Sequence, residues 1–568
     1  MRQPVVVVVT TVLLRCAAAS LSVLVEQKPI GTGRTTTLST THEPCDYGCD
    51  QVSVADDALE TCIEHLMEKW HVPGLAIAIV DGNKTWAKGF GEAKIGSEPV
   101  TPSTLFYAGS TTKSFTAAAV SLLVDESENY SSIAWDSPLV EFLRDDWLLG
   151  SEWATNHVTI EDALSHRTGY PRHDFSRVPP SSSEMVRNFR NLPMSAEPRV
   201  KFQYNNLMFG TVGYLVAKLT GSWLGEFFRE RLWEPMGMKS TYLSLRDAES
   251  SGQVLADEHR YNNDTDAYDF IPHSQFAWSE GAGMTISNVI DYSRYLRVMM
   301  AESAPLSKAG HRALKTARAV VGTKELMPFT GPVWYCLGWF GGVFAGEEVW
   351  FHSGQVNGHV TNMIMIPARN FAVVNMQNAE SFIVEVIPFK ILYDFLKVGP
   401  DKRVDMEKRH TAKLEQQDYL LKTSRERLYP SLPSPPIRRP VSIESYVGLY
   451  HHAGYGTFNV TLDCVPQELP KDSPASPTTT DDGCRLTMMV PQRQGEEAGN
   501  IRLDLEHMTG DYWVGWAYMT HFHNYRHPMA CQRVEFRVNA SGVVASVGVD
   551  ARMEGEDVPL IWSERVTS

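Results

Sequence analysis

A serine that follows a glycine and opens a small, apolar segment constrains this chain more than any other feature. Ser110 follows the extended-type run Thr104–Gly109 and opens Ser-Thr-Thr-Lys-Ser-Phe-Thr-Ala-Ala-Ala-Val-Ser-Leu-Leu-Val, which is typical of a buried helix. Residues three apart share a helix face, so Ser110 and Lys113 are predicted neighbours. A serine hydroxyl needs an adjacent base to act as a nucleophile, and a buried lysine can be that base. The first helical turn also offers N–H groups to an oxyanion.

Two further motifs follow in order along the chain. Tyr204-Asn-Asn206 supplies Tyr-x-Asn, and His352-Ser-Gly354 supplies His-x-Gly. The Ser-x-x-Lys spacing alone also fits a serine that caps the helix and a lysine whose amine reaches solvent. The ordered set is more specific than any one member, because His452-Ala-Gly454 is a second His-x-Gly outside that order.

The three motifs together resemble the serine β-lactamase and penicillin-binding-protein-like family, and within it the class C β-lactamase, D-aminopeptidase and esterase branch. The resemblance extends over residues 53–395 and includes framing segments in the same order. These segments are Leu164–Gly169, Gly213–Gly221, Glu234–Met238, Gly281–Ser287 and Leu337–Trp339. The resemblance implies an α/β catalytic domain over residues 53–400. Its expected fold is a β-lactamase/transpeptidase-like antiparallel sheet with flanking helices and a helical subdomain.

The resemblance also implies a role for most of the motif residues. Ser110 is the nucleophile, and its proton passes to the pair formed by Lys113 and Tyr204. The sequence leaves open which of the two is the general base. Asn206 either orients the lysine or binds the acyl amide of the substrate. By position, the backbone N–H groups of Ser110 and Gln355 form the oxyanion hole.

His352 and Gly354 are expected on the substrate side of the site. A lysine in place of His352 would offer a fixed positive charge to a substrate carboxylate, whereas histidine is mostly neutral at pH 7. Efficient β-lactam hydrolysis is therefore not expected, and the motif resembles peptidase and esterase members instead. The alternative for His352 is a structural strand residue. We expect His166, Arg167 and Arg172 to stabilise loops near the cleft.

Apolar runs predict two hairpins that lie far apart in the chain. Leu75–Val80 and Trp86–Phe90 flank a turn, and Val360–Ile366 and Phe371–Met376 flank another. Strands at both ends of the domain, with helices between them, predict one antiparallel sheet assembled from distant segments.

A proline-rich segment precedes a second predicted domain. Residues 401–440 are expected to form a polar helix followed by a linker. Beyond it, seven short strand-like runs within residues 441–568 predict a small antiparallel β-barrel. This barrel resembles the lipocalin-like C-terminal domain of some family members. Its role stays open between a lid over the cleft and a stabilising appendage.

The N-terminus is typical of the secretory route. Residues 1–20 combine a basic start, a short apolar run and a small-residue zone, as a signal peptide does, although Arg15 interrupts the pattern. The apolar run is too short to span a membrane. Residues 21–52 are expected to be a flexible leader. We therefore predict a secreted protein without a membrane span. The candidate glycosylation sites are Asn83, Asn129, Asn263, Asn459 and Asn539.

Cysteine spacing predicts disulfides in two places. Cys464 and Cys484 flank a Pro/Ser/Thr/Asp loop that a bridge would close, and Cys45 and Cys49 lie near Cys62. The sequence does not determine the pairing. The remaining candidates for buried thiols are Cys336 and Cys531.

Composition and the absence of certain motifs exclude several functions. The net charge of −15 and the pI near 5.7 argue against nucleic acid as a partner. The sequence contains no His-Glu-x-x-His, phosphate-cradling glycine loop or Gly-x-Ser-x-Gly elbow, and no cofactor is expected. His521, His523 and His527, with Tyr525, lack an acidic or cysteine ligand at matching spacing, so no metal site is predicted.

The leading hypothesis is a serine hydrolase that cleaves an amide or ester of a small molecule or peptide through a Ser110 acyl-enzyme. An acyltransferase that tailors a secondary metabolite would use the same residues and would exclude water from the acyl-enzyme. The third hypothesis is a non-catalytic, penicillin-recognising binding protein. A binder has no need for Ser110, Lys113, Tyr204 and Asn206 together.

Overall fold

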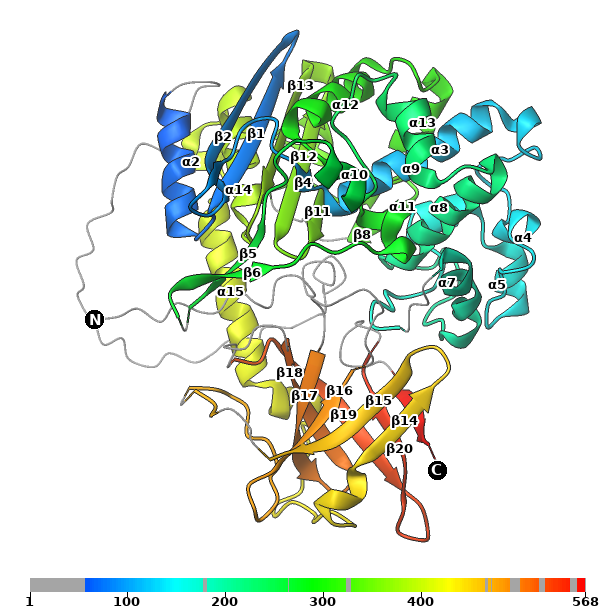
Figure 1. The fold of residues 1–568 in the computed structure, drawn as a ribbon, viewed down its shortest axis with the longest axis vertical. Helices are drawn as coiled ribbons and strands as arrows, with labels where there is room; N and C mark the ends of the chain where they lie inside the picture. Colours follow the sequence, from blue (N-terminus) through cyan, green and yellow to red (C-terminus); the bar gives the residue numbers. More distant parts are fainter. Residues whose placement is uncertain are drawn as a thin grey trace.

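The computed structural model of the protein has an α/β domain and a closed β-barrel that lies below it in Figure 1. The structure describes residues 57–176, 181–263, 265–322, 328–464, 468–470, 472–490, 501–519, 527–551 and 559–566. The predicted signal peptide and leader, residues 1–52 with Cys16, Cys45 and Cys49, lie outside these residues. So do His521, His523 and Tyr525.

An antiparallel sheet forms the centre of the α/β domain. Across the described residues its strands are, in spatial order, β3 (Glu98–Pro99), β2 (Lys84–Lys94), β1 (Gly74–Asp81), β13 (Phe371–Gln377), β12 (His359–Ile366), β11 (Glu347–Val356), β10 (Phe340–Phe344), β9 (Val333–Tyr335) and β8 (Ala319–Gly322). Leu75 of β1 lies opposite Phe90 on β2 and Gln377 on β13. Both predicted hairpins and the single sheet made from distant segments are thus confirmed.

Helices cover both faces of this sheet. α12 (Val289–Ala301) contacts β1 and β13, and α14 (Ile383–Phe395) contacts β12 and β13 and packs beside α2 (Asp57–Lys69) (Figure 1). β12 and β13 are buried at every position, and β1 at all but its last residue. Strands covered on two faces read as continuous apolar runs rather than alternating ones, which is the pattern of this sequence.

The helical subdomain lies between the two ends of the sheet. Its buried centre is α3 (Thr112–Asp125), which contacts α8 (Asn206–Thr220) and α11 (Glu280–Gly283). The other helices between β3 and β8 are α4 (Leu139–Phe142), α5 (Glu152–His157), α6 (Ile160–Leu164), α7 (Ser182–Asn188), α9 (Leu224–Phe228), α10 (Leu245–Ser250) and α13 (Lys308–Lys315). Two small sheets join β4 (Phe106–Tyr107) to β7 (Ile286–Ser287) and β5 (Glu258–Asn262) to β6 (Ala267–Ile271).

The second domain is a closed antiparallel barrel. Its strands, within the described residues, are β14 (Gly448–His452), β15 (Gly456–Asp463), β16 (Arg485–Met489), β17 (Ile501–Thr509), β18 (Tyr512–Met519), β19 (Ala530–Val538), β20 (Val544–Val549) and β21 (Ile561–Arg565). The sequence predicts all of these except β21. That strand is short and mostly polar, but Ile561 and Ser563 point into the barrel, and β21 closes it by pairing with both β20 and β14.

Two helices connect the domains. α15 (Met406–Lys422) packs on α14, and α16 (Ser424–Leu428) contacts β19. Arg425 on α16 forms an ion pair with Glu506 of β17 at 2.8 Å. The predicted linker of residues 401–440 therefore contains helices that touch both domains.

Several of the cysteine predictions fall within the described residues. Cys464 and Cys484 form the expected disulfide, with sulfur atoms 2.07 Å apart. Cys336 is a buried thiol as predicted, whereas Cys531 is only half-buried. None of the described helices is long and apolar enough to cross a membrane. In the same part of the chain, no three His, Cys, Asp or Glu side chains gather as a metal site requires.

Candidate active site

A short loop positions Ser110 at the end of β4. Gly109 adopts a positive φ of 55° and begins the 3₁₀ turn Gly109–Thr111, which leads directly into α3. Glycine adopts this conformation without the steric cost that a side chain would impose. α3 is buried over nearly its whole length, whereas Ser110 itself is only half-buried. The predicted nucleophile therefore lies in the turn that leads into a buried helix, and the residue is partly exposed.

Strand β11 passes against the backbone of this loop. A Cβ on Gly354 would collide with the carbonyl oxygen of Ala108 and lie 2.8 Å from the amide nitrogen of Ser110. A Cβ on Gly109 would in turn collide with the amide nitrogen of Gln355. The two glycines thus allow β11 to approach the Ser110 loop closely, beside the two amide nitrogens that the motif order predicts for an oxyanion hole.

Lys113 lies fully buried beneath Ser110. Its Nζ is 3.0 Å from Ser110 Oγ, 2.8 Å from Asn206 Oδ1 and 2.8 Å from the Ala282 carbonyl oxygen. The last two groups only accept hydrogen bonds. In a neutral amine, two N–H bonds serve these acceptors, and the nitrogen lone pair can take the Ser110 proton.

Asn206 holds Lys113 in this position. It is the first residue of α8, whose N-terminus is capped by the Asn205 side chain through the Met208 N–H. Asn206 Nδ2 donates to Asp174 Oδ1 at 3.3 Å. Because a carboxylate accepts here, the amide nitrogen must face Asp174 and the amide oxygen must face the lysine. The structure therefore supports the role of orienting Lys113.

The Tyr204 ring lies among cationic and aromatic groups. Lys113 Nζ is 4.9 Å and Arg172 Cζ is 5.3 Å from the ring centroid, and the His166 ring is 4.2 Å away. Tyr204 is buried at 5% exposure. The tyrosine motif is thus brought to Lys113, as the motif order predicts, and the Lys113 amine and the Arg172 guanidinium flank its ring.

His352 is buried on β11 and makes hydrogen bonds within the protein. Its Nδ1–H donates to the Ser353 carbonyl oxygen at 2.6 Å, and the Tyr335 hydroxyl donates to Nε2 at 3.1 Å. Burial, and then the charge of Lys113, lowers the pKa of His352 to about 3. The ring is 1% exposed and its centroid is 6.5 Å from that of Tyr204. His352 is therefore a neutral imidazole close to Tyr204.

His166 is a second buried, neutral imidazole in the site. It accepts a hydrogen bond from the Asn205 N–H through Nδ1 at 3.0 Å. Burial, and then the charge of Lys113, holds its pKa well below the usual value. Arg167 forms ion pairs with Glu161 and Asp162, in agreement with a loop-stabilising role. The two histidines therefore add no positive charge beside Tyr204, where Arg172 lies over the ring.

Arg172 and Asp174 lie at the site, although the sequence predicts no role in it for either residue. Arg172, expected only to stabilise a loop, lies over the Tyr204 ring, and Asp174 accepts a hydrogen bond from Asn206. Arg172 Nε donates to Asp174 Oδ2 at 2.6 Å. The available signal was an Arg-x-Asp pair that begins three residues after the framing segment Leu164–Gly169.

This geometry and fold define a class of protein. The chain matches the Beta-lactamase family over residues 59–387, more than half of its length. The chain therefore belongs to the beta-lactamase family, as the three motifs indicate.

Two fungal relatives are similar over most of the chain. Unguisins hydrolase ungD' of Aspergillus campestris is 40% identical over 450 residues, 77% of this chain and 83% of the relative. Unguisins hydrolase ungD of Aspergillus violaceofuscus is 33% identical over 542 residues, 90% of each chain. With the family match, these relatives identify the chain as a hydrolase of the beta-lactamase family.

A solved structure confirms the predicted fold class. The octameric penicillin-binding protein homologue from Pyrococcus abyssi superposes with a TM-score of 0.54 at 21% identity, over 86% of this chain and 97% of that one. At this identity the similarity concerns the fold alone.

Proposed function

We propose that this protein hydrolyses an amide or ester bond of a small molecule or peptide through an acyl-enzyme on Ser110. The observation that carries the proposal is the 3.0 Å contact between Lys113 Nζ and Ser110 Oγ, in a lysine held by two acceptor oxygens. A buried amine with this geometry is suited to take the serine proton.

The acylation step follows from these positions. As Ser110 Oγ attacks the substrate carbonyl carbon, its proton moves to Lys113. The carbonyl oxygen becomes an oxyanion that the Ser110 and Gln355 amides bind. When the tetrahedral intermediate collapses, the bond to the leaving amine or alcohol breaks, and that group takes the proton back. We assign Tyr204, whose ring centroid is 4.9 Å from Lys113 Nζ, the role of proton relay to the leaving group.

Hydrolysis completes the cycle. A water molecule gives a proton to the same Lys113/Tyr204 pair and attacks the Ser110 ester. The C–Oγ bond then breaks, the proton returns to Ser110, and the acid product leaves. The groups of this chain supply each proton transfer, and the balance requires no further reactant.

Two observations bear on the substrate. His352 is neutral and 1% exposed, so it offers no charge to the carboxylate of a β-lactam. The two fungal relatives carry the name unguisins hydrolase. We therefore propose peptidase or esterase chemistry rather than efficient β-lactam hydrolysis, with unguisins as the first compounds to assay.

Labelling and turnover test the proposal together. Wild type is treated with a fluorophosphonate probe and assayed on p-nitrophenyl esters, D- and L-amino acid anilides, unguisins and a chromogenic cephalosporin. Ser110→Ala should lose both labelling and turnover, whereas Ser103→Ala, at an exposed serine, should keep both. Labelling of Ser110→Ala would refute the assignment. Labelling of wild type that releases product only when an alcohol or amine is added would indicate an acyltransferase.

We also propose that the protein is secreted and glycosylated. The side chains of Asn83, Asn129, Asn459 and Asn539 are exposed, as acceptor sites must be. The Cys464–Cys484 disulfide fits an oxidising compartment. Recovery of the protein from the medium of a fungal host, with a mass that falls on treatment with an N-glycosidase, would support this. Retention in the cytosol at the unmodified mass would contradict it.

A further inference from the structure

One short segment links the active site to the barrel. We call residues 171–176, which follow the framing segment Leu164–Gly169, the arm. Alternate side chains of the arm make contacts on two sides: Arg172 and Asp174 contact active-site groups, and His173 and Phe175 contact the barrel. We propose that the barrel is a positioning element of the active site, which holds Arg172 and Asp174 in place through His173 and Phe175. This proposal rests on the proposed function of the Ser110 site.

The active-site side of the arm controls the orientation of Asn206. Asp174 Oδ1 accepts from Asn206 Nδ2 at 3.3 Å, and Asn206 Oδ1 contacts Lys113 Nζ at 2.8 Å. Arg172 donates to the same carboxylate at 2.6 Å and lies over Tyr204. Displacement of Asp174 would free the Asn206 amide to rotate, and Lys113 would lose a fixed acceptor. Asp174 is thus a positioning residue that acts through Asn206.

The first anchor on the barrel side is His173. Its Nε2–H donates to the Pro193 carbonyl oxygen at 2.9 Å, so Nδ1 accepts from the Tyr455 hydroxyl at 2.6 Å. Tyr455 belongs to the barrel, between β14 and β15, and is fully buried. His173 has a positive φ of 51°, a conformation that costs a non-glycine residue energy and persists only when its surroundings hold it.

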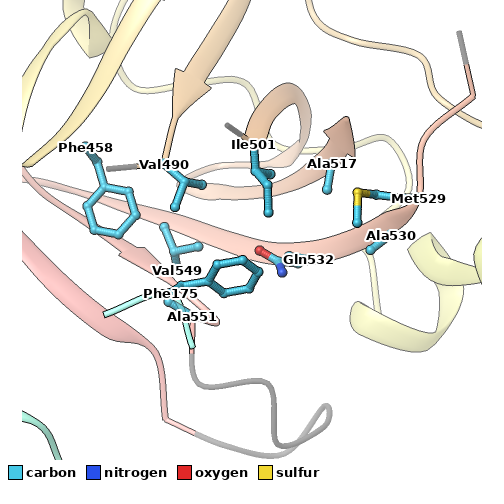
Figure 2. A pocket seen from close by; sticks show the side chains of 10 residues that line it. All are labelled: Phe175, Phe458, Val490, Ile501, Ala517, Met529, Ala530, Gln532, Val549 and Ala551. Carbon is cyan, nitrogen blue, oxygen red and sulfur yellow. The ribbon is translucent and has the colours of Figure 1, made fainter. Parts of the chain in front are cut away.

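The second anchor is Phe175, which enters the apolar interior of the barrel. Its ring shares a pocket with barrel side chains that include Phe458, Ile501, Met529 and Val549. Figure 2 shows the ring in the middle of these side chains. About 20 Å³ of free space remains there, room for no more than about one water molecule. Phe175 is half-buried, and its ring lines this pocket together with the barrel side chains.

The turn that carries Tyr455 is itself docked on the α/β domain. Asn188 Nδ2 donates to the Gly454 carbonyl oxygen at 3.0 Å. A Cβ on Gly454 would lie 2.6 Å from the Asn191 carbonyl oxygen, so only glycine allows this approach. The His452-Ala-Gly454 sequence, which has no place in the family's motif order, thus belongs to the docking surface. This turn therefore holds the barrel against the α/β domain next to the contact between His173 and Tyr455.

The proposal predicts coupling between barrel contacts and the chemistry at Ser110. In Phe175→Ala the fluorophosphonate labelling rate at Ser110 should fall roughly ten- to hundredfold, because small displacements of catalytic groups have effects of this size. Phe175→Leu, which keeps an apolar side chain in the pocket, should label at a rate close to that of wild type. Phe270→Ala, at an exposed aromatic residue of β6, should match wild type. Tyr455→Phe removes a single hydroxyl group and should also lower the labelling rate. This variant tests the proposal if Phe175→Ala does not fold.

A double variant separates positioning from general destabilisation. Asp174→Asn should slow labelling with the barrel contacts intact. Adding Phe175→Ala to Asp174→Asn should slow labelling by a smaller factor than Phe175→Ala does in the wild-type background, because both changes act in part through Asn206. Additive losses, or a folded Phe175→Ala and Tyr455→Phe that label within twofold of wild type, would overturn the proposal.

Hydrogen exchange provides a measurement that needs no activity. Amides at the start of α3 and α8 should exchange faster in Phe175→Ala and Tyr455→Phe than in Phe270→Ala. If wild type does not label but these amides still respond, the proposed function fails and the link between barrel and site stands. If labelling occurs and neither rate nor exchange responds, the link is refuted.

Discussion

The close approach of β11 to Ser110 leads to a sharp prediction for Gly354→Ala. Gly354 does not need a positive φ, so alanine is compatible with the backbone there and its effect is steric. The new Cβ would lie 2.8 Å from the Ser110 amide nitrogen and collide with the Ala108 carbonyl oxygen. An ordinary contact is at least 3.4 Å. One of the two backbones must therefore move.

The size of this movement sets the expected effect. Ser110 and β11 must separate by about 0.6 Å to relieve the amide contact, and by more to relieve the carbonyl contact. A misplacement on the order of 1 Å costs roughly 10²-fold in rate, or about 2.7 kcal/mol of transition-state stabilisation. Overpacking of this kind also lowers the free energy of unfolding by about 1–3 kcal/mol.

The assay compares kcat/KM and the labelling rate of Gly354→Ala with those of Gly150→Ala. Gly150 has a compatible φ and nothing within 4 Å of an added Cβ, so it is a matched control. A lower labelling rate in a folded Gly354→Ala, with Gly150→Ala unchanged, is the expected result. If a folded Gly354→Ala keeps its rate within threefold, the Ser110 and Gln355 amides do not form the oxyanion site.

Three further predictions follow from the structure. Lys113→Met removes the amine that contacts Ser110 Oγ, Asn206 Oδ1 and Ala282 O, so kcat/KM should fall roughly 10²- to 10⁴-fold; activity within tenfold of wild type in this folded variant would exclude Lys113 as the base. His352 has a folded pKa of about 3, below its unfolded value of 6.5, so the unfolded chain takes up a proton first as the pH falls. Its contribution to stability is therefore present above pH 6.5 and falls by about 2 kcal/mol by pH 5. In denaturant unfolding, the free energy of unfolding should therefore fall more steeply between pH 6.5 and pH 5 for wild type than for His352→Gln. An identical dependence on pH in the two proteins would contradict this prediction. The Cys464–Cys484 bridge spans 20 residues, so its replacement by serines should lower the stability of the barrel by about 3 kcal/mol in chemical unfolding, and no change in midpoint would argue against it.

Much of the fold was predictable because it depends on local patterns. The apolar runs of β1, β12 and β13 identify strands covered on both faces, and turn residues separate them. The barrel was predictable from regular strand spacing, but its last strand, β21, was not. Its buried positions are Ile561 and the polar Ser563, so the strand has no alternating apolar pattern, and closure depends on pairing with β14, more than one hundred residues earlier.

Some contacts of the active site were also predictable from the sequence, and others were not. The sequence by itself determined that Ser110 and Lys113 are neighbours, since helical period alone sets that contact, and the order of motifs indicated Tyr204, Asn206 and His352. Only the tertiary structure decided that His352 is buried and neutral, because desolvation depends on what covers a side chain. Only the tertiary structure, likewise, brought Asp174 to Asn206 and Phe175 to the apolar pocket of the barrel. These contacts join segments that no local period relates, and their energies exist only once the two domains have packed together.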